Sequence, residues 1–290
     1  MMPTPKDNGN AMYVLARGTG HPILFLHGMP TSSHLWDGII DRMHGKFTCL
    51  AVDLPGLGRT ATTPQAFHEL VALADRMEAL RIECNVDQWH VVGHDAGCAV
   101  AVHYAHRYQD RVQRLALLSP SIFPELKPFR LFEILRKPVL GELMAPAVSL
   151  FFWKLVMRWA FDYRRDTSQA VKDFNAPFGG LSGSWRLMSL MRWGDPAQVL
   201  SAIPALLPEL KIPTLIFHGS KDRAVPRAFA TRTSQLIPNS ELIFVKSGHF
   251  LPLNEPEAIA SELIHFFGQQ ENLQVPASTY ERMLETAPTE

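Results

Sequence analysis

The stretch WHVVGHDAG, residues 89–97, carries the strongest structural signal in the chain. Its first four residues are mostly apolar and large, as is typical of a buried β-strand. The turn Gly93-His94-Asp95-Ala96-Gly97 follows, and a helical pattern then continues from Ala96 to about His106. The sequence therefore predicts a strand, a sharp turn flanked by glycines, and a helix, with the side chain of Asp95 projecting from the turn.

The same rhythm recurs on both sides of this stretch. Apolar runs that each end in turn or polar residues lie at 22–26, 48–52, 115–118, 214–217 and 242–245. Strands that alternate with helical patterns are typical of a mostly parallel sheet flanked by helices, so the predicted fold class is α/β. A closing helix is expected from Pro256 to Gly268, with the proline early and the glycine late.

The strand rhythm breaks between about residues 121 and 210. Large apolar and aromatic residues are frequent there, and Gly179, Gly180 and Gly183 interrupt them without a strand pattern. This region is interpreted as an inserted helical cap. The predicted organisation is a discontinuous core of residues 10–120 and 211–268, a cap of residues 121–210, and a polar C-terminal tail of residues 269–290.

Composition argues against several classes of function. The 28 basic and 28 acidic residues cancel, so nothing favours a nucleic-acid partner. The three cysteines are widely spaced, which indicates buried thiols and, together with a polar N-terminal stretch, a cytoplasmic protein. The apolar stretch at 143–161 contains Pro146, Lys154 and Arg158, so no transmembrane segment is expected. Its basic pair is interpreted as a solvated stripe in preference to a membrane-surface helix.

Polar residues stand at the carboxyl end of each predicted strand, where ligands bind in parallel α/β sheets. Asp95 follows the third strand, Asp222 follows the run at 214–217, and His249 follows the run at 242–245. A glycine-flanked aspartate alone is a weak signal, because such turns are common for structural reasons. Its combination with an acid and a histidine at two further strand ends predicts a nucleophilic site.

The chain resembles the α/β-hydrolase superfamily, and within it the branch of epoxide hydrolases and haloalkane dehalogenases. The matching motifs are His27-Gly28-Met29-Pro30, Asp53-Leu54-Pro55-Gly56, the aspartate turn at 93–97, Asp222 and His249, in the family's order of nucleophile, acid and histidine. The resemblance covers residues from about 10 to 268. It implies an α/β-hydrolase fold and an enzyme with an aspartate nucleophile at the turn known as the nucleophile elbow.

The resemblance also implies roles for individual residues. Asp95 would form an ester with the substrate, His249 would activate the water that hydrolyses it, and Asp222 would orient His249. The backbone N–H groups of Met29 and Ala96 would form the oxyanion hole. Four supporting residues are expected to be site-framing or structural: His27, His94, Asp53 and Gly56. His218 is expected to be a strand-end histidine.

Candidate substrate-binding residues are aromatic. They are Trp36, Trp153, Tyr163 and Trp193, and an apolar pocket is expected around them. Epoxide hydrolases usually carry two cap tyrosines that protonate the opening oxygen, whereas Tyr163 is the single tyrosine in this cap. Dehalogenases usually place tryptophan after the nucleophile and often asparagine after His-Gly, whereas this chain has Ala96 and Met29.

The sequence therefore predicts an epoxide hydrolase that acts on a small apolar substrate and water, without a metal or cofactor. A haloalkane or haloacid dehalogenase is the first alternative. An esterase or lactonase, a lyase, a cofactor-independent oxygenase and a non-catalytic ligand sensor remain open on the same fold. A homodimer is compatible with the sequence, which does not determine the oligomeric state.

Overall fold

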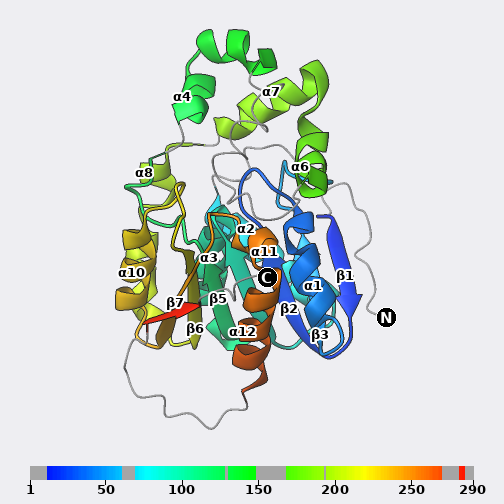
Figure 1. The fold of residues 1–290 in the computed structure, drawn as a ribbon, viewed down its shortest axis with the longest axis vertical. Helices are drawn as coiled ribbons and strands as arrows, with labels where there is room; N and C mark the ends of the chain where they lie inside the picture. Colours follow the sequence, from blue (N-terminus) through cyan, green and yellow to red (C-terminus); the bar gives the residue numbers. More distant parts are fainter. Residues whose placement is uncertain are drawn as a thin grey trace, which may run out of the picture.

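The computed structural model describes residues 12–60, 69–127, 130–147, 168–192, 194–269 and 281–284. Eight strands form one sheet in the order β1-β3-β2-β4-β5-β6-β7-β8 (Figure 1). Only β1 runs antiparallel, against β3, and the remaining described pairs are parallel. The strands are β1 (Val14–Gly18), β2 (His21–Leu26), β3 (Phe47–Val52), β4 (Trp89–His94), β5 (Val112–Leu118), β6 (Thr214–Gly219), β7 (Ser240–Val245) and β8 (Glu281–Leu284).

Helices cover both faces of this sheet. Helices α1 (Asp37–Met43) and α12 (Pro256–Gly268) pack together on one face, and α2 (Leu70–Glu83) and α3 (Ala96–Arg107) pack together on the other (Figure 1). Helix α10 (Arg227–Leu236) packs on β6 and β7. The central strands are buried along nearly their whole length, which is why they are almost continuously apolar. The predicted α/β-hydrolase fold class is confirmed.

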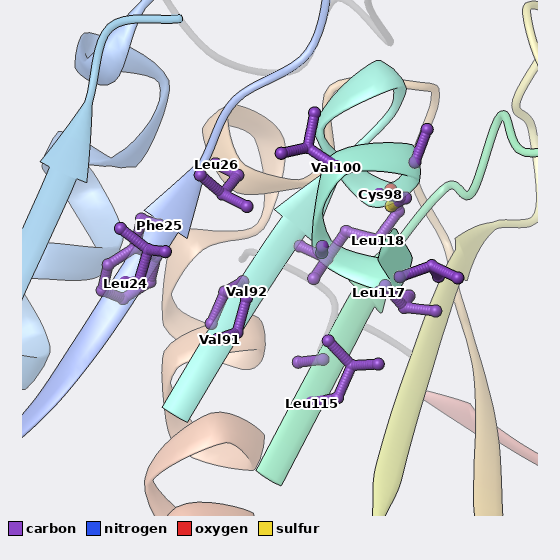
Figure 2. Packing of buried hydrophobic residues seen from close by; sticks show 14 of the residues in the cluster. Leu24, Phe25, Leu26, Val91, Val92, Cys98, Val100, Leu115, Leu117 and Leu118 are labelled. Atoms are coloured by element: carbon purple, nitrogen blue, oxygen red, sulfur yellow. The ribbon is translucent and has the colours of Figure 1, made fainter. Parts of the chain in front are cut away.

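Part of the core lies where the central strands meet α3. Buried aliphatic side chains of β2, β4 and β5 belong to one hydrophobic cluster with Cys98 and Val100 of that helix (Figure 2). All three cysteines are buried and free, as the sequence predicted.

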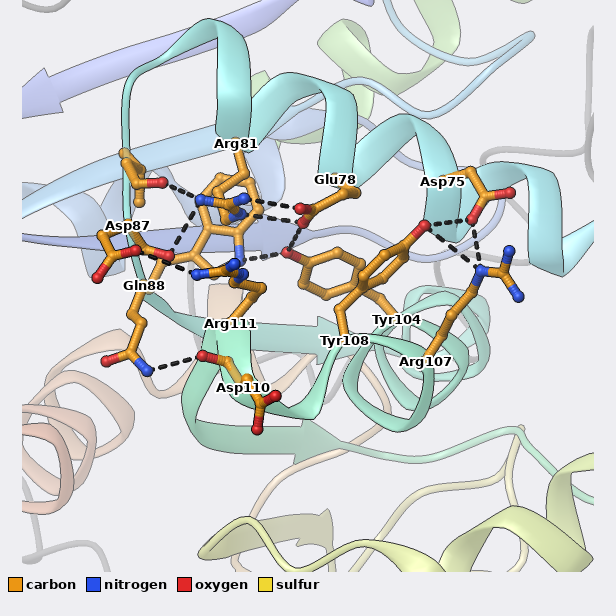
Figure 3. A network of polar contacts seen from close by, with 12 residues as sticks. Asp75, Glu78, Arg81, Asp87, Gln88, Tyr104, Arg107, Tyr108, Asp110 and Arg111 are labelled. Carbon is orange, nitrogen blue, oxygen red and sulfur yellow. Dashed lines mark hydrogen bonds and ion pairs between the residues drawn. The ribbon is translucent and has the colours of Figure 1, made fainter.

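A buried polar network also fixes α3 against α2 and β4 (Figure 3). Arg81 on α2 donates hydrogen bonds to both carboxylate oxygens of Glu78, at 2.7 and 2.9 Å. The Tyr104 hydroxyl on α3 donates to Glu78 at 2.9 Å and accepts from the Trp89 indole on β4 at 3.1 Å. Because a buried charge is costly unless it is paired, these contacts hold α3 in one orientation on β4.

The region between β5 and β6 contains helices and loops and, in its described parts, no strand. It contains α4 (Arg130–Arg136), α6 (Ser168–Asn175), α7 (Gly180–Met191), α8 (Pro196–Val199) and α9 (Ile203–Leu206), with short 3₁₀ turns at Ala176–Phe178 and Leu207–Glu209. Helices α4, α6 and α7 lie beyond one end of the sheet (Figure 1). Arg186 on α7 donates to the carbonyl oxygens of Gly56 and Thr60, both at 3.2 Å, in the loop that follows β3. The inserted helices therefore lie over the carboxyl ends of the strands.

Two strands were not predicted. Val14–Gly18 is an edge strand that pairs with β3 and is exposed over its last three residues. Glu281–Leu284 adds to β7 at the other edge, within the segment interpreted from sequence as a polar tail. Within the described parts of the chain, no helix combines the length and the hydropathy needed to cross a membrane.

Candidate active site

Asp95 occupies a strained turn between β4 and α3. Its backbone has φ of +50° and ψ of −121°, a conformation that non-glycine residues rarely adopt and that costs of order 1–3 kcal/mol. Such strain is typical of residues whose side chain must project for function. Between the Met29 loop and β3, the chain forms a short 3₁₀ helix at Ser33–Trp36 and then helix α1.

The glycines around Asp95 are required by space. A Cβ atom on Gly97 would lie 2.3 Å from the carbonyl oxygen of Leu26, and one on Gly28 would lie 2.5 Å from the Cβ of Asp95. A Cβ atom on Gly93 would come within 2.9 Å of backbone atoms at the start of α3. Gly97 is therefore needed for the turn to pack against β2, and Gly93 for the end of β4 to pack against the start of α3.

The Asp95 carboxylate is held between the Met29 loop and His249. Its Oδ2 atom accepts a hydrogen bond from the Met29 N–H at 3.0 Å, and its Oδ1 atom lies 3.7 Å from His249 Nε2. The side chain is 15% exposed. The N–H of Ala96 is at the first position of α3, where a helix leaves its N–H groups without intrahelical partners. Of the two backbone groups predicted for an oxyanion hole, the Met29 N–H contacts this carboxylate, and the Ala96 N–H directly follows Asp95 in the chain.

His249 follows β7 and is paired with Asp222, which follows β6. His249 Nδ1 donates to Asp222 Oδ2 at 2.9 Å, and Asp222 Oδ1 accepts from the N–H groups of Ala224 and Val225 at 2.8 and 2.9 Å. The structure therefore brings together Asp95, Asp222 and His249 from three strand ends.

Burial and charge oppose one another in this pair. Burial would lower the pKa of His249, but the charge and hydrogen bond of Asp222 and the charge of Asp95 together raise it to about 9. Burial would raise the pKa of Asp222, but the imidazolium of His249 holds the pKa of that carboxyl well below its usual range. In this resting arrangement a protonated His249 lies between two carboxylates.

His94 supports the backbone of His249. Its Nε2 atom lies 3.0 Å from the carbonyl oxygen of His249, and since a carbonyl can only accept, Nε2 carries the proton. The two rings are 4.9 Å apart between centroids. Burial and the nearby charge of His249 lower the pKa of His94 to about 4, so it stays neutral at pH 7. His94 therefore frames the site, in line with its interpretation from sequence.

His27 and Asp53 hold the loops around Met29. The Leu54 N–H donates to His27 Nε2 at 2.9 Å, so His27 Nδ1 carries the proton and donates to the Gly28 carbonyl at 2.7 Å. Asp53 accepts from the N–H groups of Ser33 and Arg59 at 2.6 and 2.8 Å. Gly56 accepts from the cap through its carbonyl. These contacts are structural, because they hold the loops in place. His218 lies elsewhere, as a buried residue of β6 near its carboxyl end.

The predicted aromatic substrate-binding residues are less fully placed. Trp36 is wholly buried, packs on Phe25 at 5.2 Å between centroids and stands edge-on to His94 at 6.4 Å, so its observed contacts are with the core. Trp153, Tyr163 and Trp193 lie outside the described residues. Their contact with a substrate remains a prediction.

Sequence reasoning missed one residue of the site, Ser119. It directly follows β5, and its hydroxyl donates to Asp222 Oδ2 at 2.8 Å. A serine after an apolar strand is common in loops, so the sequence carried no signal for this contact beyond its position at a strand end.

Comparison with known proteins places the chain in a family. A family model described as the alpha/beta hydrolase fold matches residues 21–256. A soluble epoxide hydrolase from Corynebacterium sp. (strain C12) is 34% identical, over 90% of this chain and 94% of the relative. A cis-3-alkyl-4-alkyloxetan-2-one decarboxylase from Shewanella oneidensis is 27% identical, over 92% of this chain and 88% of the relative.

The chain is also similar to a solved structure. The crystal structure of the haloalkane dehalogenase DbeA from Bradyrhizobium elkani USDA94 aligns with a TM-score of 0.73 and 26% identity, covering 89% of this chain and 94% of that one. The match of the family model over most of the chain, with relatives of this kind, shows that the chain belongs to the α/β-hydrolase fold family.

Proposed function

We propose that the protein hydrolyses small apolar epoxides through a covalent ester on Asp95. The observation that carries this proposal is a carboxylate at the tip of the strained turn, held by the Met29 N–H at 3.0 Å and with His249 Nε2 at 3.7 Å. A carboxylate suits attack on a saturated carbon, because the ester that it forms can be hydrolysed in a second step. The 34% identity with a soluble epoxide hydrolase supports the epoxide class.

In the first proposed step, one carboxylate oxygen of Asp95 attacks a ring carbon of the epoxide. A carbon–oxygen bond forms as the ring carbon–oxygen bond breaks, and the released alkoxide takes a proton from a general acid. The Met29 N–H holds the other carboxylate oxygen and so fixes the direction of attack. We assign the general acid to Tyr163, as the resemblance to epoxide hydrolases implies.

In the second proposed step, neutral His249 removes a proton from water, whose oxygen attacks the carboxyl carbon of the Asp95 ester. The N–H groups of Met29 and Ala96 stabilise the resulting oxyanion. The intermediate collapses, and the alcohol oxygen of the diol leaves and takes the proton from His249. The Asp95 carboxyl group then returns the remaining proton of the water to the general acid, and both groups are regenerated. Asp222 stabilises the imidazolium during this step through its 2.9 Å hydrogen bond.

Similarity to the oxetan-2-one decarboxylase favours a second candidate, the opening of a strained lactone ring. Attack of Asp95 on the saturated ring carbon would break the ring carbon–oxygen bond and release a carboxylate, which needs no proton. Loss of carbon dioxide from that carboxylate would then form the alkene as the bond between this carbon and Asp95 breaks, which frees the Asp95 carboxylate. Haloalkane dehalogenation is less well supported, because the side chains at Met29 and Ala96 carry no N–H donor to hold the departing halide. Ester hydrolysis and non-catalytic ligand binding are further outcomes that a screen would detect.

The first experiment identifies the reaction. Epoxides, β-lactones, organohalides, haloacids and activated esters would be incubated with the enzyme, and the products would be identified by mass. A diol supports the epoxide proposal, whereas an alkene with carbon dioxide supports the lactone candidate. Ligand-dependent melting without turnover of any class would contradict both.

The second experiment follows the oxygen atom in one turnover. With enzyme in excess in ¹⁸O-water, the product should be largely unlabelled while the Asp95 peptide gains ¹⁸O, because water attacks the carboxyl carbon of the ester. Labelled product with an unlabelled Asp95 peptide would show that water attacks the substrate directly. Asp95 would then be a base, and the ester mechanism would be wrong.

A further inference from the structure

Ser119 has an unusual backbone for its position. Its N–H donates to the Phe217 carbonyl on β6 at 2.8 Å, and the carbonyl of the residue before it, Leu118, accepts from the Asp95 N–H at 3.0 Å. The backbone around Ser119 is therefore bonded to β6 on one side and to the Asp95 turn on the other. Its φ of +46° lies in the left-handed region, which a non-glycine residue adopts only when the surroundings impose it. The residue is wholly buried, so the strain is not explained by a loop at the surface.

The hydroxyl of Ser119 completes the hydrogen bonding of Asp222. Oδ2 accepts from Ser119 Oγ at 2.8 Å and from His249 Nδ1 at 2.9 Å, and Oδ1 accepts two backbone N–H groups. The Asp222 side chain is fully buried. A carboxylate that accepts four hydrogen bonds cannot rotate without breaking several of them. Each accepted hydrogen bond also weakens the attraction of the carboxylate for a proton.

We propose that Ser119 is a positioning residue, which fixes the Asp222 carboxylate on His249 and weakens its basicity so that His249 can release a proton within the catalytic cycle. The inference rests on the proposed role of His249 as the base for ester hydrolysis. Without the Ser119 hydroxyl, Asp222 Oδ2 would carry more negative potential, and the imidazolium of His249 would be stabilised. A larger share of His249 would then stay protonated at neutral pH, and ester hydrolysis would slow.

Other charged and titratable groups also face this pair. Asp95 lies on the Nε2 side of His249, His94 packs on its ring, and His218 on β6 interacts with Asp222. Burial lowers the pKa of both His94 and His218 to about 4, so neither changes charge between pH 5 and 9. Both also stay neutral at the higher pH values over which His249 titrates, so the effect of Ser119 can be measured there on His249.

The test is the pKa of His249, measured by NMR titration of its imidazole nitrogens and assigned with His249→Gln. Removal of the hydroxyl in Ser119→Ala should raise this pKa by about 0.5 to 1, as expected for the loss of one hydrogen bond to the charged partner. Ser119→Gly should give the same rise, and since glycine adopts positive φ without strain, it should fold even if the alanine variant does not. Ser121→Ala, a buried serine two residues further along, is the matched control and should leave the pKa unchanged.

A double-variant comparison shows whether Ser119 acts through Asp222. In an Asp222→Asn background, Ser119→Gly should no longer raise the pKa of His249, because the carboxylate that carries the effect is gone. An unchanged or lowered pKa in both Ser119 variants would overturn the inference, as would an equal rise in the Asp222→Asn background. The readout requires no turnover, so failure of the ester mechanism in the oxygen-tracing experiment would be seen separately.

Where a substrate is found, the acid limb of the pH profile of kcat should move upward in Ser119→Gly by the same amount as the pKa. A variant that lowers kcat equally at every pH would show a structural role for Ser119 and overturn its assignment as a positioning residue.

Discussion

The charge on Asp95 should control the proton affinity of His249, and Asp95→Asn tests this directly. The Oδ1 atom of Asp95 lies 3.7 Å from His249 Nε2, and the two side chains are 15% and 6% exposed. Two unit charges at this separation interact by about 1 kcal/mol at the dielectric constant of water and by about 4.5 kcal/mol at an effective value of about 20. Because one pKa unit corresponds to about 1.4 kcal/mol, removal of the Asp95 charge should lower the pKa of His249 by about 1 to 3.

The sign follows from the charges. A negative Asp95 stabilises the imidazolium, so its neutralisation favours neutral His249, and the pKa should fall from about 9 to about 6–8. Formation of the ester removes the same charge during the proposed reaction. The enzyme would thus gain a neutral base near pH 7 at the step where water must be activated.

The assay is NMR titration of His249 in the wild-type protein and in Asp95→Asn, with intact mass used to exclude deamidation back to aspartate. Asp110→Asn, in the turn before β5 at the opposite end of the sheet, is the matched control and should leave the pKa unchanged. A pKa within about 0.3 of the wild-type value in Asp95→Asn would refute the reasoning, because a discharged neighbour at this distance cannot be silent in so buried a site.

Three further predictions concern the same elements. In His249→Gln, alkylation should proceed while ester hydrolysis stops, so intact mass after substrate addition should show a stable adduct; equal loss of both steps with no adduct would contradict the two-step scheme. Gly97→Ala should lower the unfolding free energy in urea by at least about 2 kcal/mol, because its Cβ would lie 2.3 Å from a backbone carbonyl oxygen, whereas Gly268→Ala has nothing within 4 Å and should change it little. Burial lowers the pKa of His90 from 6.5 to about 3. Between these two pH values the unfolded chain binds more protons than the folded chain, so the free energy of unfolding falls as the pH falls from 6.5 toward 3. His90→Phe should therefore reduce the loss of unfolding free energy between pH 7 and pH 5 by about 1–2 kcal/mol, and an unchanged loss would rule out this linkage.

Most of the sheet could be predicted because its central strands are buried on both faces. Such strands are short apolar runs with turn residues after them, and β2 to β7 have this form. The edge strand Val14–Gly18 lacks it, since three of its five residues are exposed and its partner is a strand that follows later in the chain. Glu281–Leu284 pairs at the other edge within a polar segment, where no periodicity indicates a strand.

The candidate site could be predicted for a different reason. Asp95, Asp222 and His249 are far apart in sequence, but each follows a strand of one parallel sheet, and the carboxyl ends of β4, β6 and β7 lie at the same edge. Topology thus brings the three side chains together. Ser119 also follows a strand, yet the direction of its hydroxyl depends on a φ of +46°, which no sequence pattern specifies.

The two proposed half-reactions place opposite demands on His249. During attack, a protonated His249 between Asp95 and Asp222 balances the two buried carboxylates, which would otherwise repel one another. During hydrolysis the same ring must be neutral to take a proton from water. Esterification of Asp95 removes one carboxylate charge, and the donors around Asp222, including Ser119, limit the pull of the other. The change in protonation that the cycle requires would therefore follow from the chemistry of the nucleophile itself, without movement of the three residues.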